Sequence, residues 1–122
     1  MITGIVNSDL EATVQLTVRG PGGPSRRITA VIDTGFDGFL SLPPALVADL
    51  GLPWDHQTYA TLAAGSEILV DMFLGSIVWN RRQRLIDIDE SDTEPLVGTG
   101  LLANCEMKVQ FRPRGLVAIK PL

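Results

Sequence analysis

The residues best placed to do chemistry are Asp33, Thr34 and Gly35, which interrupt the apolar stretch "AVIDTGFDGFL" at residues 30–40. A carboxylate at the end of an apolar run lies at the edge of a core, where a charge is costly unless it has a partner or a function. Two carboxyl groups a few ångströms apart share one proton, so one acts as a base toward water while the other donates to a carbonyl. The chain has a single Asp-Thr-Gly. This chemistry therefore requires a homodimer that brings Asp33 of each copy to a two-fold axis.

A calcium loop is a weaker interpretation of the same residues. Asp33, Asp37 and Gly38 occupy the first, fifth and sixth positions of such a loop. Gly35 at the third position and Pro44 at the twelfth supply none of the side-chain oxygens that Ca²⁺ requires there. The spacing therefore argues against calcium.

Two further chemistries have little support. The acidic segment "DIDES" at residues 87–91 resembles the nucleophile motif of the haloacid dehalogenase phosphatases, but their parallel sheet needs crossover helices that this chain lacks. A Ser/His/Asp triad would have to use His56, the single histidine, which lies in the polar segment "WDHQ" and is more simply a surface residue. No glycine-rich nucleotide-binding motif is present.

Alternating apolar residues predict that strands position the Asp. Residues 13–18 and 27–32 form a hairpin around the turn "GPGGP", and the second strand leads directly into Asp33. Residues 42–51 predict a short helix with Ser41 as its N-cap. The remaining expected elements are two or three strands in residues 58–79 with a hairpin tip at Ala64, Gly65 and Ser66, a strand at 85–89, an apolar pair at 96–97 followed by a helical turn at 101–103, and a last strand at 116–119.

Composition limits the class of protein. At 122 residues the chain predicts one domain, residues 1–122, and no stretch is apolar enough to span a bilayer. The N-terminal residues lack the pattern of an export signal, so we expect a cytoplasmic protein with no membrane partner. The net charge of −4 argues against nucleic-acid binding. One cysteine, Cys105, and one histidine cannot form a Cys/His zinc cluster.

Three motifs, in order along the chain, resemble the retropepsin-like aspartic proteases, and in particular their short bacterial members. They are "VIDTGFDGFL" as the catalytic strand and turn, "LAAGSEI" as a flap hairpin, and "PLVGTGLL" as an apolar pair and glycine before a helical turn. The resemblance implies a mainly all-β, small closed β-barrel-like acid-protease fold with one or two short helices. It implies a homodimeric aspartic endopeptidase that acts on peptides or proteins and needs no metal or organic cofactor.

The resemblance also implies roles for individual residues. Asp33 matches the catalytic aspartate, and Thr34 matches the residue whose hydroxyl braces the two active-site turns across the dimer. Gly35 matches a residue whose backbone lets substrate approach closely, and Asp37 falls where the retroviral enzymes bind substrate main chain. The flap tip that closes over substrate is expected at Ala64, Gly65 and Ser66. The C-terminal residues 115–122 are a candidate for pairing across the dimer, although the sequence does not determine which strands form that interface.

Two positions depart from the family pattern. Phe36 stands where the retroviral enzymes usually have a small residue, and Gly98 is followed by Thr99 instead of the arginine that commonly braces the position of Asp37. These departures keep a second function open, a non-catalytic dimeric module that binds an extended peptide as an added strand. Asp33 also has a purely structural interpretation as a strand-end turn residue, as do Asp37 with its neighbouring glycine and the hairpin tip.

Overall fold

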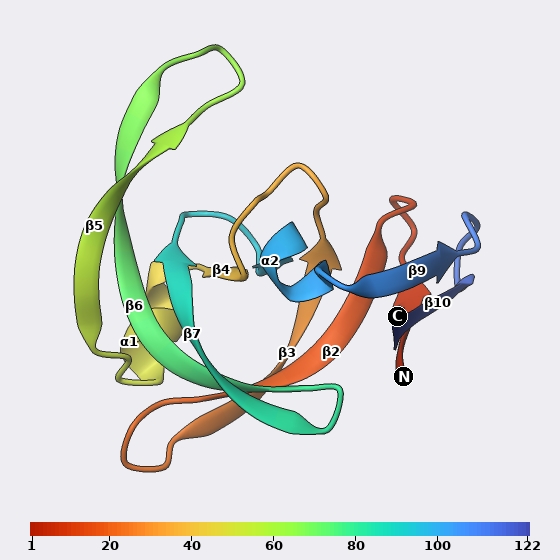
Figure 1. Cartoon of the computed structure of the whole chain (residues 1–122), viewed down its shortest axis with the longest axis horizontal. Coiled ribbons are helices and arrows are strands. Elements are labelled where there is room, and N and C mark those ends of the chain that lie inside the picture. Colours follow the sequence, from red (N-terminus) through yellow and green to blue (C-terminus); the bar gives the residue numbers. More distant parts are fainter.

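The computed structural model describes residues 1–122, which form ten strands and two short helices (Figure 1). The strands are β1 (Ile2–Val6), β2 (Ala12–Arg19), β3 (Ser25–Ile32), β4 (Leu40–Leu42), β5 (Trp54–Thr61), β6 (Glu67–Trp79), β7 (Arg82–Glu90), β8 (Leu96–Val97), β9 (Cys105–Val109) and β10 (Leu116–Pro121). The helices are α1 (Pro44–Asp49) and α2 (Thr99–Leu102). The mainly β class predicted from the sequence is confirmed.

Six strands close into a barrel. They pair in the order β2, β3, β8, β4, β7 and β6, and the pairing of Val18 in β2 with Ile77 in β6 closes the ring. β5 extends the sheet outward from β6, and β1, β10 and β9 extend it from β2 (Figure 1). The small closed barrel expected for this chain is confirmed, with one hairpin arm on the β6 side and a small sheet on the β2 side.

The β2–β3 hairpin carries the chain into the site. Val14, Leu16 and Val18 alternate with more exposed residues and face the core, so burial of one face sets the register of this strand. Gly22 and Gly23 make the turn at φ values of 81° and 111°, a region of backbone that favours glycine. The predicted hairpin and its turn are confirmed.

Strand β8 lies between β3 and β4. Val31 pairs with Leu96 in a parallel ladder, while Leu40 pairs with Val97 in an antiparallel one. The 33–39 turn that connects β3 to β4 must therefore pass over the end of β8. This crossing brings residues 33–39 beside residues 98–100, which are about 60 positions further along the chain.

The first helix is shorter than predicted. Ser41 is not its N-cap, because it lies in β4 with 3% of its surface exposed. β4 pairs with both β7 and β8, and Leu40 and Leu42 are fully buried, so tertiary pairing holds these residues extended. The helix begins only at Pro44, after an extended Pro43. Proline is favoured at this first position because its missing N–H would have no helical partner.

The C-terminal strand has no free edge. β10 pairs with β1 on one side and with β9 on the other, both within the same chain. Residues 116–121 are therefore not available to pair across a dimer, in contrast to the arrangement considered for residues 115–122. The unpaired edge of this small sheet belongs to β9.

Candidate active site

Asp33 lies at the point where β3 ends. Its N–H donates to the carbonyl of Val97 at 2.9 Å, so the strand ladder continues to the residue itself. The N–H of Gly35 donates to Asp33 Oδ1 at 2.9 Å, and the second carboxyl oxygen makes no hydrogen bond within the chain. The side chain is half-buried. One oxygen is thus held in place while the other is free for a reactant.

Backbone hydrogen bonds join the 33–39 turn to residues 98–100. They run from the N–H groups of Gly98, Thr99 and Gly100 to the carbonyls of Phe39, Phe36 and Gly38 at 3.0, 2.9 and 3.0 Å. Gly98 is required by this approach, because an added Cβ would lie 2.2 Å from the carbonyl oxygen of Gly38. Gly98, the first glycine in "PLVGTGLL", therefore positions the turn that carries Asp33.

Thr34 is exposed, and its hydroxyl makes no hydrogen bond within the chain. Together Asp33 and Thr34 line a hollow of about 450 Å³ beside β9, which we call the β9 hollow. Gly35 is also exposed, and an added Cβ there would lie 3.2 Å from Asp33 Oδ1. The structure thus places the three motif residues together at the surface.

A second space of about 510 Å³ lies between the 33–39 turn and the β5–β6 hairpin, and we call it the hairpin cavity. Its walls are residues 35–38 of the turn, residues 58–61 of β5, and Met72 and Asp89 from β6 and β7. Asp37, predicted to bind substrate, lines this cavity. The hairpin cavity therefore adjoins Asp33 on the side where a hairpin extends outward (Figure 1).

The predicted tip residues Ala64, Gly65 and Ser66 do form the end of the β5–β6 hairpin. The N–H of Leu62 donates to the carbonyl of Ser66 at 2.8 Å, and Gly65 has a φ of 87°. All three residues are exposed, and the arm of the hairpin, not its tip, lines the cavity. In Figure 1 the tip lies at the far end of the arm, apart from the 33–39 turn.

Asp89 is a site residue that the sequence interpretation missed. Burial, followed by repulsion from Asp37 and Asp87, raises its pKa from 3.8 to about 6. Its carboxylate lies against Gly38, since an added Cβ there would be 3.1 Å from Asp89 Oδ1. The signal was present in "LIDIDE", where the period of two buries Ile88 and places Asp87 and Asp89 together on the other face.

The Phe36 side chain lies against two glycines beside the turn. An added Cβ at Gly98 or Gly38 would lie 2.6 or 2.5 Å from the Phe36 ring, so the ring packs over the two glycines. It also lines the hairpin cavity. Thr99, at the position of the missing arginine, donates its hydroxyl to the Phe36 carbonyl at 3.4 Å. The local bracing of the turn is therefore made by an aromatic ring and a hydroxyl.

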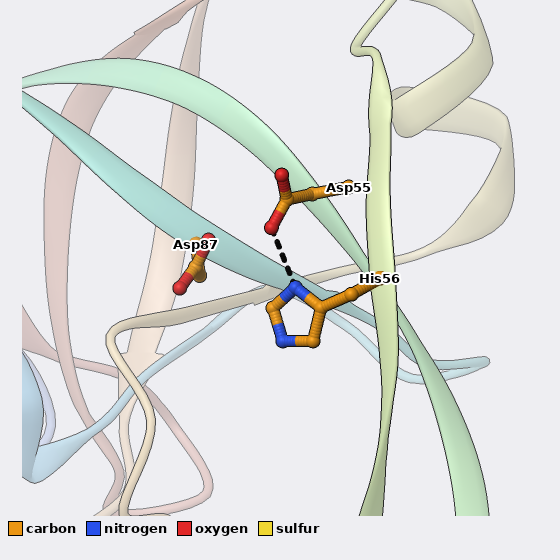
Figure 2. A group of neighbouring side chains, drawn as sticks. All are labelled: Asp55, His56 and Asp87. Atoms are coloured by element: carbon orange, nitrogen blue, oxygen red, sulfur yellow. Dashed lines mark hydrogen bonds and ion pairs between the residues drawn. The ribbon is translucent and has the colours of Figure 1, made fainter.

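Outside the site, Asp55, His56 and Asp87 are close enough to hold one metal ion, with their ligand atoms within 4.8 Å of one another (Figure 2). His56 Nδ1 pairs with the Asp55 carboxylate. A register shift between Trp54 and His56 interrupts the regular alternation of β5 at this point. An imidazole with two carboxylates suits a divalent transition metal. None of the three lines the hairpin cavity or the β9 hollow.

The structure has no helix of the length and apolarity needed to cross a membrane.

Comparison with known proteins gives a match among solved structures. Neither a protein-family model nor a curated protein matches the sequence. The crystal structure of a retropepsin-like aspartic protease from Rickettsia conorii is similar, with a TM-score of 0.57 over 98% of this chain and 91% of that one, at 14% sequence identity. The chain therefore has the fold of a retropepsin-like aspartic protease. At this identity the likeness defines the fold and leaves the activity to be argued from the site.

Proposed function

We propose that this protein is an aspartic endopeptidase that acts as a homodimer on peptide or protein substrates. The observation that carries the proposal is the setting of Asp33, whose Oδ1 accepts a bond from the Gly35 N–H while the other oxygen is free. Asp33 lines the β9 hollow, and the residues that follow it in the turn line the hairpin cavity. The retropepsin-like fold supports the same activity. We place the protein in the cytoplasm, as the sequence predicts.

The reaction would use one shared proton. Ionised Asp33 of one copy removes a proton from water, and the resulting hydroxide adds to the peptide carbonyl carbon. The partner subunit's Asp33, protonated, donates its proton to the carbonyl oxygen. Collapse of the tetrahedral intermediate breaks the C–N bond as a proton passes to the leaving amine. A mechanism that needs one ionised and one protonated carboxyl predicts a bell-shaped dependence of the rate on pH.

The neighbouring residues would position the substrate and the two turns. The free Thr34 hydroxyl is proposed to bond across the dimer and brace the paired turns. Gly35 leaves room for substrate main chain, and Asp37 in the hairpin cavity would bind that chain through backbone N–H groups. Ala64, Gly65 and Ser66 would move inward to close over the substrate and exclude water.

Substitution Asp33→Asn tests the proposal, because it removes the base and the acid together while preserving shape. We expect cleavage of a diverse peptide mixture, followed by mass spectrometry from mildly acidic to neutral pH, to fall by about 10³-fold or more. Asp92→Asn, at an exposed loop residue, is the control and should cleave normally. Equal cleavage by Asp33→Asn would exclude the mechanism. A folded, dimeric parent that cuts nothing at any pH would support the non-catalytic peptide-binding module instead.

A further inference from the structure

The β9 hollow is an exposed surface with a mainly apolar lining. Eight of its eleven lining residues are apolar, and the polar ones are Glu11, Asp33 and Thr34. Two large apolar side chains stand at its rim, with 49% of Leu10 and 69% of Phe111 exposed. An exposed surface on which large apolar side chains gather is typical of a site that another molecule covers.

The two rim residues belong to neighbouring turns. Leu10 lies in the β1–β2 turn, and Phe111 lies in the β9–β10 turn. The turns lie side by side, because the N–H of Arg114 donates to the carbonyl of Val6 at 2.9 Å. We call the β9 hollow together with these two turns the β9 face. In Figure 1 the β9 strand and the β5–β6 hairpin lie on opposite sides of the 33–39 turn.

The charges of the β9 face complement one another. The β1–β2 turn carries Asp9 and Glu11, while the β9–β10 turn carries Arg112 and Arg114. None of the four takes part in an ion pair within the chain. A surface with both signs side by side can face itself across a two-fold axis, because the acidic turn of one copy meets the basic turn of the other.

We infer that the β9 face is the interface with a second copy of this chain. The inference rests on the proposed function, since a shared dyad requires Asp33 and Thr34 of both copies at the two-fold axis, and both residues line this hollow. The terminal strand cannot supply the contact, because both edges of β10 are occupied. The partner's apolar rim residues then cover those of the first copy.

The size of a stable interface sets how far the contact must extend. Such an interface buries about 800 Å² on each partner, and the chain exposes 7324 Å² in total. The contact would therefore cover about a tenth of the surface, so that it extends beyond the hollow onto the neighbouring turns.

Sedimentation velocity over a wide concentration range tests the inference. We expect the parent to dimerise and Phe111→Asp to weaken the dimer at least about 30-fold, the effect of losing one large apolar contact. Leu85→Asp is the matched control, because Leu85 on β7 is 71% exposed and lies outside the β9 face. The dissociation constant of the Leu85→Asp dimer should equal that of the parent. Arg112→Glu, a second variant, should also weaken the dimer. This effect should become smaller as salt is added, because salt screens exposed charges.

A parent dimer that Phe111→Asp and Arg112→Glu leave intact would overturn the inference, as would a parent that is monomeric throughout. Peptide cleavage by the same samples separates this failure from that of the proposed function. If the variants leave the dimer unaffected and it cleaves peptides, the proposed interface is wrong and the peptidase activity is supported. If a monomer cleaves, the shared-dyad mechanism is wrong. If Phe111→Asp dissociates the dimer but no sample cleaves, the interface is supported and the peptidase activity is wrong.

Discussion

The 33–39 turn separates two spaces of similar size that are lined by different kinds of residue. The hairpin cavity, about 510 Å³, has only four apolar residues among ten and contains Asp37 and Asp89. The β9 hollow, about 450 Å³, has eight among eleven. Residues 33–34 face the hollow and residues 35–38 face the cavity. Adjacent residues of one turn thus meet two different environments.

One short motif can therefore serve two contacts. A cavity that keeps carboxylates beside a hairpin suits an extended substrate, which brings its own N–H groups and side chains. A hollow lined mainly by apolar residues is better covered by another apolar surface, because burial of apolar area is favourable and non-directional. Under the proposed function, the cavity would receive the substrate and the hollow would receive the partner.

The largest effect is expected from Gly98→Ala, which perturbs both spaces at once. The new Cβ would approach the carbonyl oxygen of Gly38 to 2.2 Å, so the backbone of the turn must move. We expect the free energy of unfolding to fall by about 3 kcal/mol, measured by urea unfolding. Gly35→Ala is the control, because its Cβ meets only Asp33 Oδ1, at 3.2 Å. An equal loss of unfolding free energy in Gly98→Ala and Gly35→Ala would contradict the role given to Gly98.

A smaller, pH-dependent effect is expected from Asp89→Asn in the hairpin cavity. Because burial and the neighbouring Asp37 and Asp87 raise the pKa of Asp89 to about 6, the folded state holds this proton more tightly than the unfolded state. The parent therefore loses stability as pH rises from about 4 through 6. Asn carries no charge. The variant should be more stable than the parent at pH 8 by about 1 kcal/mol, a value limited by solvent screening.

Urea unfolding at pH 4 and pH 8 measures this effect. At pH 4 the two proteins should differ little, because the Asp89 carboxyl is then protonated in the folded protein. Asp92→Asn, at an exposed position, should show no such dependence on pH. The same difference between parent and Asp89→Asn at both pH values would show that the charge of Asp89 is not the cause.

The smallest effect is expected from Asp71→Ala at the base of the β5–β6 hairpin. Asp71 Oδ1 accepts bonds from Trp54 Nε1 and Gln57 Nε2, both at 3.0 Å, and so ties β5 to β6. Loss of these partly exposed bonds should cost about 0.5–1 kcal/mol. Amide hydrogen exchange should accelerate in residues 54–61 and stay unchanged beside the β9 hollow. Asp49→Ala, which removes the exposed pair with Arg26, should leave the exchange of the hairpin unaltered.

Much of the fold was predictable because its signals are local. Val14, Leu16 and Val18 alternate in sequence and all face the core, and the glycines at residues 22–23 mark the turn that follows. The same kind of reasoning failed at Ser41. Its sequence context favours a helix cap, but pairing of β4 with two distant strands holds it extended. The local preference of a residue for a helix cap is outweighed when the residue is buried in a strand between two neighbouring strands.

The candidate site was also predictable only in part. The break in an apolar run at Asp33 is visible in the sequence, and the structure places it at the end of β3 as expected. Asp89 was missed because it becomes part of the cavity only through the pairing of β7 with β4 and β6. The β9 face was missed for a similar reason, since its two turns are about 100 residues apart along the chain.

The strand periodicity, the principal turns and the single Asp-Thr-Gly can be read from the sequence, because each of these depends on residues close together along the chain. The passage of β8 between β3 and β4, the enclosure of β10 within its own chain, and the position of one turn between a cavity with two carboxylates and a hollow lined mainly by apolar residues follow only from the three-dimensional structure. These features depend on which distant surfaces bury one another. That choice is made by packing over the whole chain, because the alternation of residues within a strand sets which face is buried but not which strand covers it.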